Sequence, residues 1–272
     1  MKFWRLTQPD SDSDYRHSYI NGGLSNPFGL PGISCEVCNV KFGGSRVLPF
    51  ECPQELREKT HFIERWPVPC EQHKALQAEL RSGLAKQGVK INNLFPGDRL
   101  QPSYLDIPSR PRADFLWASI GSVVVSERIK NLFDSLKIEG VVFCPVILRK
   151  VGKREAKLQP PIPVTGEPED IIEEVPLLKS TQEISPYYEL IIQNESNYPA
   201  DGKPVSICSA CGWKKFSKPD RQLVMNESMW SGAHIFFLAP TYFIAVTDIV
   251  KTELRKIRAT NIVFEPLPAS EI

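Results

Sequence analysis

Two cysteine pairs of identical spacing constrain this chain of 272 residues more than any other feature of its sequence. Cys35 and Cys38 form the first pair, Cys208 and Cys211 form the second, and residues 39–207 lie between them. Two thiolates that are two residues apart can converge on one metal ion, and two such pairs supply the four ligands of a closed tetrahedral site. The sequence therefore predicts a structural Zn²⁺ site that joins two distant parts of the chain and has no open coordination position for a substrate.

The residues around the pairs bear on the choice between a metal site and a redox site. Asn39 and Gly212 follow the two pairs, and both residue types accept the left-handed backbone conformation that a zinc knuckle often has at this place. A redox dithiol of the thioredoxin type would lie between a strand and a helix, whereas both pairs here lie among Gly, Pro and Ser. A redox dithiol and two metal-free thiol pairs stay open as alternatives. The seven cysteines are an odd number, which favours reduced thiols or metal ligands over a complete disulfide framework.

Composition and charge exclude several classes of protein. Apolar residues make up 42% and charged residues 24% of the chain, which is typical of a folded globular protein. A formal net charge of +1 lacks the excess of Lys and Arg that a general nucleic-acid binder needs. The sequence has neither an apolar stretch long enough to span a membrane nor the apolar segment of a secretory signal, so we expect a cytoplasmic protein. It also lacks the common nucleophile, phosphate-loop, dinucleotide and HExxH motifs, and we expect no enzymatic activity.

A pattern of strand, helix and strand occurs twice, 121 residues apart. Val123–Val146 and Ile244–Leu267 both combine an apolar run, a helix with one apolar face and a second apolar run. Ser126 and Thr247 stand where the helices begin, so that a side-chain oxygen could cap the first backbone N–H groups. The repeat predicts an α+β fold in which a mixed sheet contains a duplicated β-α-β unit beside a zinc-knuckle subdomain, although two unrelated crossovers would share some of these features.

Changes in composition along the chain predict four regions. A loop-rich zinc-knuckle region covers residues 1–50 and 195–235, and a helical connection covers 51–110. The first β-α-β unit, with an acidic loop, covers 111–194, and the second unit covers 236–272. Many prolines and glycines lie between the predicted helices and strands, so we expect long irregular connections.

One longer helix is predicted over residues 71–86, where leucines repeat every four residues and Gly88 follows the last turn. Cys70 and His73 at its start have the spacing of two metal ligands, but a core cysteine and a surface histidine explain them more simply. We therefore do not add them to the predicted zinc ligands. Cys144 fits the core of the strand that closes the first β-α-β unit.

Two segments are candidates for contact with a partner. After the second cysteine pair, Trp213 and Phe216 alternate with lysines and could bind a nucleic acid, although packing of both rings over the knuckle is the simpler interpretation. Carboxylates can bind a basic surface of a partner protein, although a solvated loop is the simpler interpretation of an acidic run. The dense acidic run of this sequence consists of Glu167, Glu169, Asp170, Glu173 and Glu174.

Further short motifs are distributed over most of the chain. They are Gly29-Leu-Pro-Gly-Ile-Ser-Cys35, Phe95-Pro-Gly97, Asp114-Phe-Leu-Trp117, a helix leading to Gly140-Val-Val-Phe143, and the late second pair with its glycine. In this order the motifs resemble the bacterial double-CxxCG family, with one departure, the asparagine after the first pair. Members of that family are regarded as immunity proteins that protect a cell from a polymorphic toxin delivered by its kin. The resemblance implies a non-enzymatic protein that binds and masks one cognate protein toxin.

A second class of function stays open beside this one. A zinc-stabilised adaptor or regulator that binds nucleic acid would have a similar sequence, and a basic surface around Lys214, Lys215, Lys218 and Arg221 would favour it. The near-neutral charge of the chain makes a nucleic-acid partner the weaker expectation.

Overall fold

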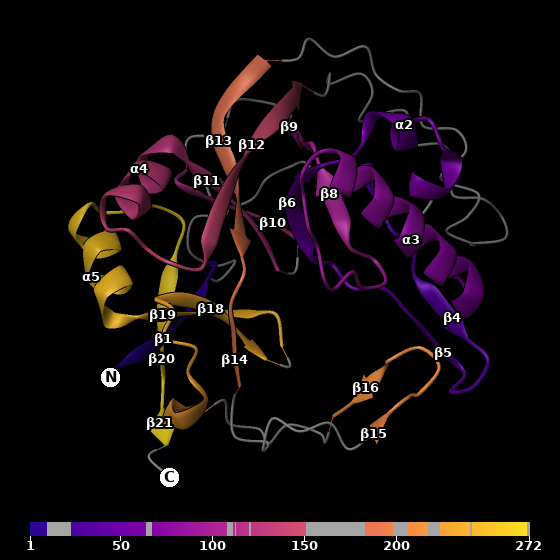
Figure 1. Cartoon of the computed structure of the whole chain (residues 1–272). Helices are drawn as coiled ribbons and strands as arrows, with labels where there is room; N and C mark the ends of the chain where they lie inside the picture. Colours follow the sequence, from indigo (N-terminus) through magenta and orange to yellow (C-terminus); the bar gives the residue numbers. More distant parts are fainter. Residues whose placement is uncertain are drawn as a thin grey trace, which may run out of the picture.

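Strands predominate in the part of the chain that the structure describes, where they form several mixed sheets and are accompanied by four α-helices (Figure 1). The predicted α+β class is confirmed, but the expectation that a mixed sheet contains both copies of the repeated unit was wrong, because the copies lie in two separate sheets that pack on a common apolar core. None of the described helices is long and apolar enough to cross a membrane. The computed structural model describes residues 1–9, 23–63, 67–107, 111, 113–119, 121–150, 183–197, 206–216, 224–239 and 241–270.

A six-stranded sheet contains the first copy of the repeated unit. Its strands are β2 (Leu24–Ser25), β9 (Ser103–Ile107), β10 (Phe115–Ser119), β11 (Ser122–Ser126), β12 (Val141–Lys150) and β13 (Glu183–Ile192). Their order is β10-β11-β13-β12-β9-β2. The helix α4 (Glu127–Ser135) connects β11 to β12, so the predicted β-α-β succession is confirmed for this copy.

A five-stranded sheet contains the second copy. Its strands are β1 (Phe3–Thr7), β14 (Glu195–Asn197), β18 (Ile235–Ala239), β19 (Phe243–Thr247) and β20 (Val263–Leu267), in the order β14-β18-β19-β1-β20. The helix α5 (Asp248–Lys256) connects β19 to β20, as predicted. In both copies an antiparallel strand from elsewhere in the chain lies between the two parallel strands of the unit, β13 in the first and β1 in the second. The two units are therefore split in the same way.

The similarity between the two units extends beyond the segments in which the sequence pattern predicted it. A hairpin strand precedes each unit, β10 before β11 and β18 before β19. The helix ends also match, because Lys137 and Arg258 have left-handed backbones with φ of 51° and 53°. Gly140 and Asn261, a second pair of equivalent positions, also have left-handed backbones, with φ of 85° and 63°. Equivalent positions thus keep the same rare conformation even where the residue type differs.

The two copies share one apolar core. The helices α4 and α5 lie near each other at one side of the molecule (Figure 1), where Arg128 Nη1 donates a hydrogen bond of 3.1 Å to the carbonyl oxygen of Ile257. Burial of apolar surface between the copies is the largest stabilising term available to this part of the fold. The buried residues of this core are Leu6, Phe115, Val123, Val125, Ile129, Phe133, Ile138, Leu190, Ile192, Ile235, Ile244, Val246, Val250 and Leu254.

Ser126 and Thr247 occupy the N-cap positions, as predicted, but neither side chain caps its helix. The hydroxyl of Ser126 donates to Asp114 Oδ1 at 2.8 Å, and Thr247 Oγ1 lies 3.1 Å from His234 Nδ1. The expectation of side-chain caps was wrong because both hydroxyls have a partner on a neighbouring segment. They join each helix start to the strands beside it.

A second core surrounds α3 (Cys70–Lys86), which confirms the helix predicted over 71–86. Gly88 follows it with φ of 79°. His73 is only 2% exposed, so the expectation of a surface histidine was wrong: it lies three residues before Leu76 and therefore on the same buried helix face. The buried residues of this core are Leu30, Leu48, Cys52, Leu56, Phe62, Leu76, Leu80, Leu84, Leu94 and Leu100. Cys144 is buried in the first sheet, as predicted.

Shorter elements complete the described structure. Those near α3 are β3 (Phe28–Gly29), β6 (Val47–Glu51), β8 (Arg99–Gln101), α2 (Gln54–Arg57) and the 3-10 helix η1 (Thr60–Phe62). Those near the cysteine pairs are β4 (Ile33–Cys35), β5 (Val40–Phe42), β7 (Val68–Pro69), β15 (Ser206–Ile207) and β16 (Lys214–Lys215). Near the C-terminus lie β17 (Met225–Asn226), the 3-10 helix η4 (Glu227–Met229) and β21 (Ala269–Ser270).

Candidate metal centre

Four cysteines from two distant segments converge at one point. The Sγ atoms of Cys35, Cys38, Cys208 and Cys211 all lie within 4.8 Å of one another. Across the two pairs, the sulfurs of Cys35 and Cys208 are 3.9 Å apart, and those of Cys38 and Cys211 are 3.6 Å apart. Within the described ranges, this is the one group of three or more His, Cys, Asp or Glu side chains close enough together to hold a metal ion. The structure thus brings together the four cysteines that the spacing singled out.

Each pair lies in a tight turn between two short antiparallel strands. Cys35 is the last residue of β4 and pairs with Val40, the first residue of β5. In the second pair, the backbone N–H of Gly212 donates to the carbonyl oxygen of Cys208 at 2.9 Å. Asn39 and Gly212 have φ of 56° and 73°, which is the left-handed conformation expected after each pair. The turns therefore have the backbone geometry of two metal knuckles.

Backbone N–H groups favour the thiolate form of the first sulfur in each pair. The N–H of Cys38 lowers the pKa of Cys35 to about 6, against the opposing effect of burial. The N–H groups of Cys211 and Ala210 likewise lower the pKa of Cys208. Burial raises the pKa of Cys211 to about 12. A cation bound among the four sulfurs would favour the deprotonated form of all of them.

One aromatic contact adds to the link between the two turns. The ring of Trp213 lies on the ring of Phe42, with 4.8 Å between centroids and a tilt of 49°. Trp213 is still 36% exposed, and Phe216 is half-buried. Trp213 thus packs on the first knuckle, the one that comes from the other end of the chain. The hairpin β15–β16 itself exposes its side chains and lies apart from the two large sheets (Figure 1).

A fifth cysteine lies beside the centre, a relationship that sequence reasoning missed. The strands β4 and β7 are parallel, with Ile33 opposite Val68 and Ser34 opposite Pro69. One residue further along both segments come Cys35 and Cys70. Burial and then a hydrogen bond with Cys35 raise the pKa of Cys70. The signal was weak, because β7 is only two residues long and is half proline.

A pocket of about 250 Å³ adjoins the cysteine cluster. Its lining includes Cys70, His73 and Lys74 from α3, together with Phe95 and Cys211. Burial lowers the pKa of His73, whose Nε2 atom has no hydrogen-bond partner among the described residues. The sulfur of Cys70 and the ring nitrogens of His73 do not belong to the group of four sulfurs that lie close enough together to hold one ion.

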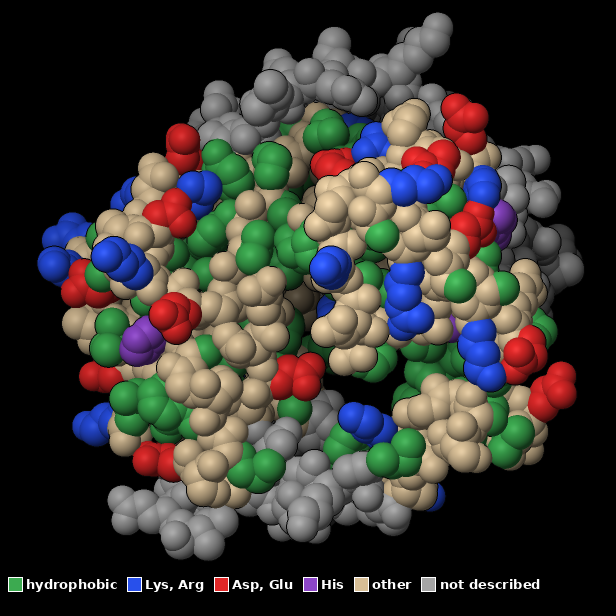
Figure 2. Space-filling model, viewed as in Figure 1, with side chains coloured by type: hydrophobic (Ala, Val, Ile, Leu, Met, Phe, Trp, Pro, Cys, Tyr) green, Lys and Arg blue, Asp and Glu red, His purple; other side chains and the backbone are tan. Residues whose placement is uncertain are grey.

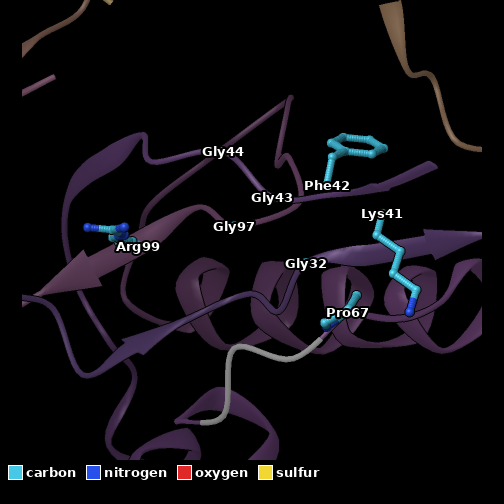
Figure 3. Close-up of a pocket in the computed structure, with 8 residues that line it drawn as sticks. All are labelled: Gly32, Lys41, Phe42, Gly43, Gly44, Pro67, Gly97 and Arg99. Carbon is cyan, nitrogen blue, oxygen red and sulfur yellow. The ribbon is translucent and has the colours of Figure 1, made fainter. Parts of the chain in front are cut away.

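A larger pocket of about 330 Å³ lies next to the first knuckle (Figure 3). Figure 3 shows Lys41 and Arg99 on opposite sides of a group of glycines. Gly97, with φ of 82°, could not carry a side chain, because a Cβ atom there would overlap the backbone of Gly44. The glycines are thus explained by close packing of two loops. The eight residues that line this pocket include no carboxylate, His, Cys or Ser for acid–base or nucleophilic chemistry.

Other predicted contact residues lie outside the described ranges. These are the acidic run of Glu167, Glu169, Asp170, Glu173 and Glu174, and the cations Lys218 and Arg221. No protein-family model matches the chain, and a search of curated proteins found no match. The arguments for function therefore come from the cysteine centre, the surrounding structure and the sequence motifs.

Proposed function

We propose that the four cysteines hold a structural Zn²⁺ ion. In a tetrahedral site with Zn–S bonds of about 2.3 Å, neighbouring sulfurs are about 3.8 Å apart. The distances of 3.9 Å and 3.6 Å across the two pairs support such a site. Four thiolates suit zinc and iron and do not suit magnesium or calcium. Elemental analysis of the purified protein tests the assignment: one zinc per chain supports it, whereas stoichiometric iron or no metal contradicts it.

We propose further that the protein has no enzymatic activity. A closed site with four cysteine ligands leaves no position for a substrate or an activated water. The motifs that carry the family resemblance also support a structural role. Gly97 allows two loops to pack closely, and Asp114 links the two repeated units through hydrogen bonds to Thr260. These motifs therefore serve the fold, and binding of a partner would depend on other surfaces of the protein.

The function that these observations support best is that of an immunity protein, which binds a cognate protein toxin and blocks it in the cytoplasm. The observation that carries the proposal is the cysteine centre, which joins two segments far apart in the sequence and consists of the two CxxC pairs that also contribute to the double-CxxCG resemblance. A folded scaffold with a structural metal and no catalytic site suits a protein whose work is binding.

Co-expression with the product of the adjacent toxin gene tests this proposal. Wild-type protein should restore survival of cells that make the toxin, and the two purified proteins should bind each other. Reversal of the charges of Glu167, Glu169, Asp170, Glu173 and Glu174 should slow association and weaken its dependence on salt. Unchanged protection by this variant would remove the acidic run from the interface, and failure of the wild type to bind or protect would remove the immunity function.

One observation favours the second candidate, a regulator that binds nucleic acid. Lys214 and Lys215 form the exposed strand β16, directly after the partly exposed Trp213. Against it, Figure 2 shows Lys and Arg side chains interspersed with Asp and Glu on the visible face, without one large basic patch. Lys214→Glu together with Lys215→Glu would abolish binding of a single-stranded oligonucleotide if this function applied. No measurable binding by the wild type at low salt would exclude it.

A further inference from the structure

Cys70 stands beside the metal centre without being one of its four ligands. The paired residues of β4 and β7 end at Ser34 and Pro69, and Cys35 and Cys70 are the next residue of each segment. The helix α3, which begins at Cys70, contacts β4. Residues opposite each other on neighbouring strands are about 5 Å apart, within the range of about 4.4–6.8 Å between Cα atoms that a disulfide needs. The fold therefore places the thiol of Cys70 beside a proposed metal ligand, at the point where the pairing of β4 with β7 ends.

Access to solvent distinguishes Cys70 from the other cysteines outside the proposed ligand set and from its neighbour Cys35. Cys35 is only 2% exposed, and Cys52 and Cys144 are buried in the apolar cores. Cys70 is half-buried and lines the pocket beside the cluster. Of the seven cysteines, it is thus the one that combines partial exposure with freedom from the proposed ion. A small oxidant that enters the pocket meets its sulfur next to the metal centre.

We propose that Cys70 is an oxidation site through which a hydroperoxide converts Cys70 and Cys35 into a disulfide and releases the metal ion. The inference goes beyond the immunity function and rests on the proposed zinc site. Cys35 would lose its place as a ligand, and the remaining three thiolates would hold the ion more weakly. Loss of the ion would separate the second knuckle from the first, so the site would couple oxidation to the shape of this surface.

The proposed oxidation has two steps. The sulfur of Cys70 attacks the hydroperoxide, the O–O bond breaks, and the thiol proton passes to the leaving oxygen, which gives Cys70 sulfenic acid and an alcohol or water. The thiolate of Cys35 then attacks this sulfur, so that its bond to the metal and the S–O bond break while hydroxide leaves. Each sulfur loses one electron, and the hydroperoxide gains two.

Timed oxidation of the zinc-loaded protein tests the proposal. Wild-type protein is treated with hydrogen peroxide while a chromogenic chelator records released zinc, and the digested protein is searched for linked cysteine peptides by mass spectrometry. We expect a peptide pair that joins Cys35 to Cys70, and restoration of zinc binding after a thiol reductant. In Cys70→Ser the zinc content before oxidation should be unchanged. The release of zinc after peroxide is added should be about tenfold slower, because the sulfur that is oxidised first is missing.

Control variants separate this outcome from a change in folding. Cys144→Ala lacks a buried thiol elsewhere and should release zinc at the wild-type rate. Cys70→Ala serves as a second variant, because it shows whether a fall in zinc content comes from the serine hydroxyl. Equal rates in wild-type protein and Cys70→Ser, or disulfides among the four ligands alone, would overturn the proposal. Protein purified without zinc would instead refute the zinc site, and the Cys35–Cys70 peptide would still be scored in that protein.

Discussion

The carboxylate of Asp114 accepts two hydrogen bonds from Thr260, one from the backbone N–H at 2.9 Å and one from the hydroxyl at 3.0 Å. The hydroxyl of Thr260 also accepts a hydrogen bond of 2.8 Å from the backbone N–H of Asp114. Asp114 precedes β10 in the first unit, and Thr260 lies between α5 and β20 in the second. These three hydrogen bonds join the two repeated units next to their shared apolar core.

Replacement of Asp114 by alanine should destabilise the protein by about 1–3 kcal/mol, because Ser126, Arg128 and Thr260 would lose the buried carboxylate that accepts their hydrogen bonds. Asp114 is 6% exposed and also accepts a hydrogen bond of 2.5 Å from Arg128 Nη2. Urea denaturation of Asp114→Ala, Thr260→Ala and the double variant measures the coupling between the two residues. Effects that add within a few tenths of a kcal/mol would mean that the side chains are independent.

Acid should weaken the same contact. Burial tends to raise the pKa of Asp114, but hydrogen bonds from Arg128, Thr260 and Ser126 outweigh it and lower the pKa below its usual range. The stabilisation from this carboxylate is therefore complete above the unfolded-state pKa of about 4 and is lost as the pH falls through the lower folded-state value. Between pH 5 and pH 3, the urea midpoint of Asp114→Asn should fall less steeply than that of the wild type. The matched control is Asp134→Asn, at a carboxylate on the exposed face of α4, which should keep the wild-type slope.

Much of the repeated unit was predictable because its signals are local. The helical stripe, the apolar runs and the position of the helix starts at Ser126 and Thr247 follow from nearest-neighbour patterns. Strand β13 lies between the parallel strands of the first unit, and β1 between those of the second. Both come from distant segments, and nothing in their own sequence predicts which strands they pair with. The side chains of Ser126 and Thr247 were misjudged for the same reason, since their partners Asp114 and His234 lie on other segments.

The cysteine centre is the exception, a long-range contact that the sequence did predict. This contact could be predicted from metal coordination, because two pairs of thiolates with the same spacing complete one tetrahedral site. Cys70 offered no such signal, since a single cysteine at the start of a helix is ordinary in a core. Only the pairing of β4 with β7, which ends one residue before both cysteines, brings it beside Cys35.

The glycine after the second cysteine pair should be difficult to replace. Gly212 has φ of 73° with no atom near its Cβ position, so a valine there would meet no clash but would adopt a conformation that costs about 1–2 kcal/mol. We expect Gly212→Val to bind zinc about tenfold more weakly, as measured by competition with a chelator. Asn39→Gly, at φ of 56° in the first pair, is the matched control and should bind zinc at least as tightly as the wild type. Equal affinity in Gly212→Val would show that the left-handed turn is not required.

Removal of the metal should loosen the second knuckle before it affects the repeated units. The side chains of β15 and β16 are exposed, whereas Val125 and Val246 are fully buried in the shared core. After chelation, hydrogen exchange should become faster in residues 206–216 and stay slow in β11 and β19. Loss of protection in all of these segments at once would show that the metal supports the whole fold.

Two residues at the ends of α4 and α5 offer a test of the duplication itself. Lys137 and Arg258 have φ of 51° and 53°, a region that costs an ordinary residue about 1–2 kcal/mol and a glycine almost nothing. The backbone N–H of the next residue bonds back to the helix in the same way in both copies, from Ile138 to Phe133 at 3.0 Å and from Ala259 to Leu254 at 2.9 Å. After the greater chain entropy of glycine in the unfolded state is subtracted, Lys137→Gly and Arg258→Gly should each raise the free energy of unfolding by about 0.5 kcal/mol. Urea denaturation should give the two variants the same sign and a similar size, and the double variant should show the sum. A gain in one copy with a loss in the other would mean that the two helix ends are not energetically equivalent, despite their matching backbone angles.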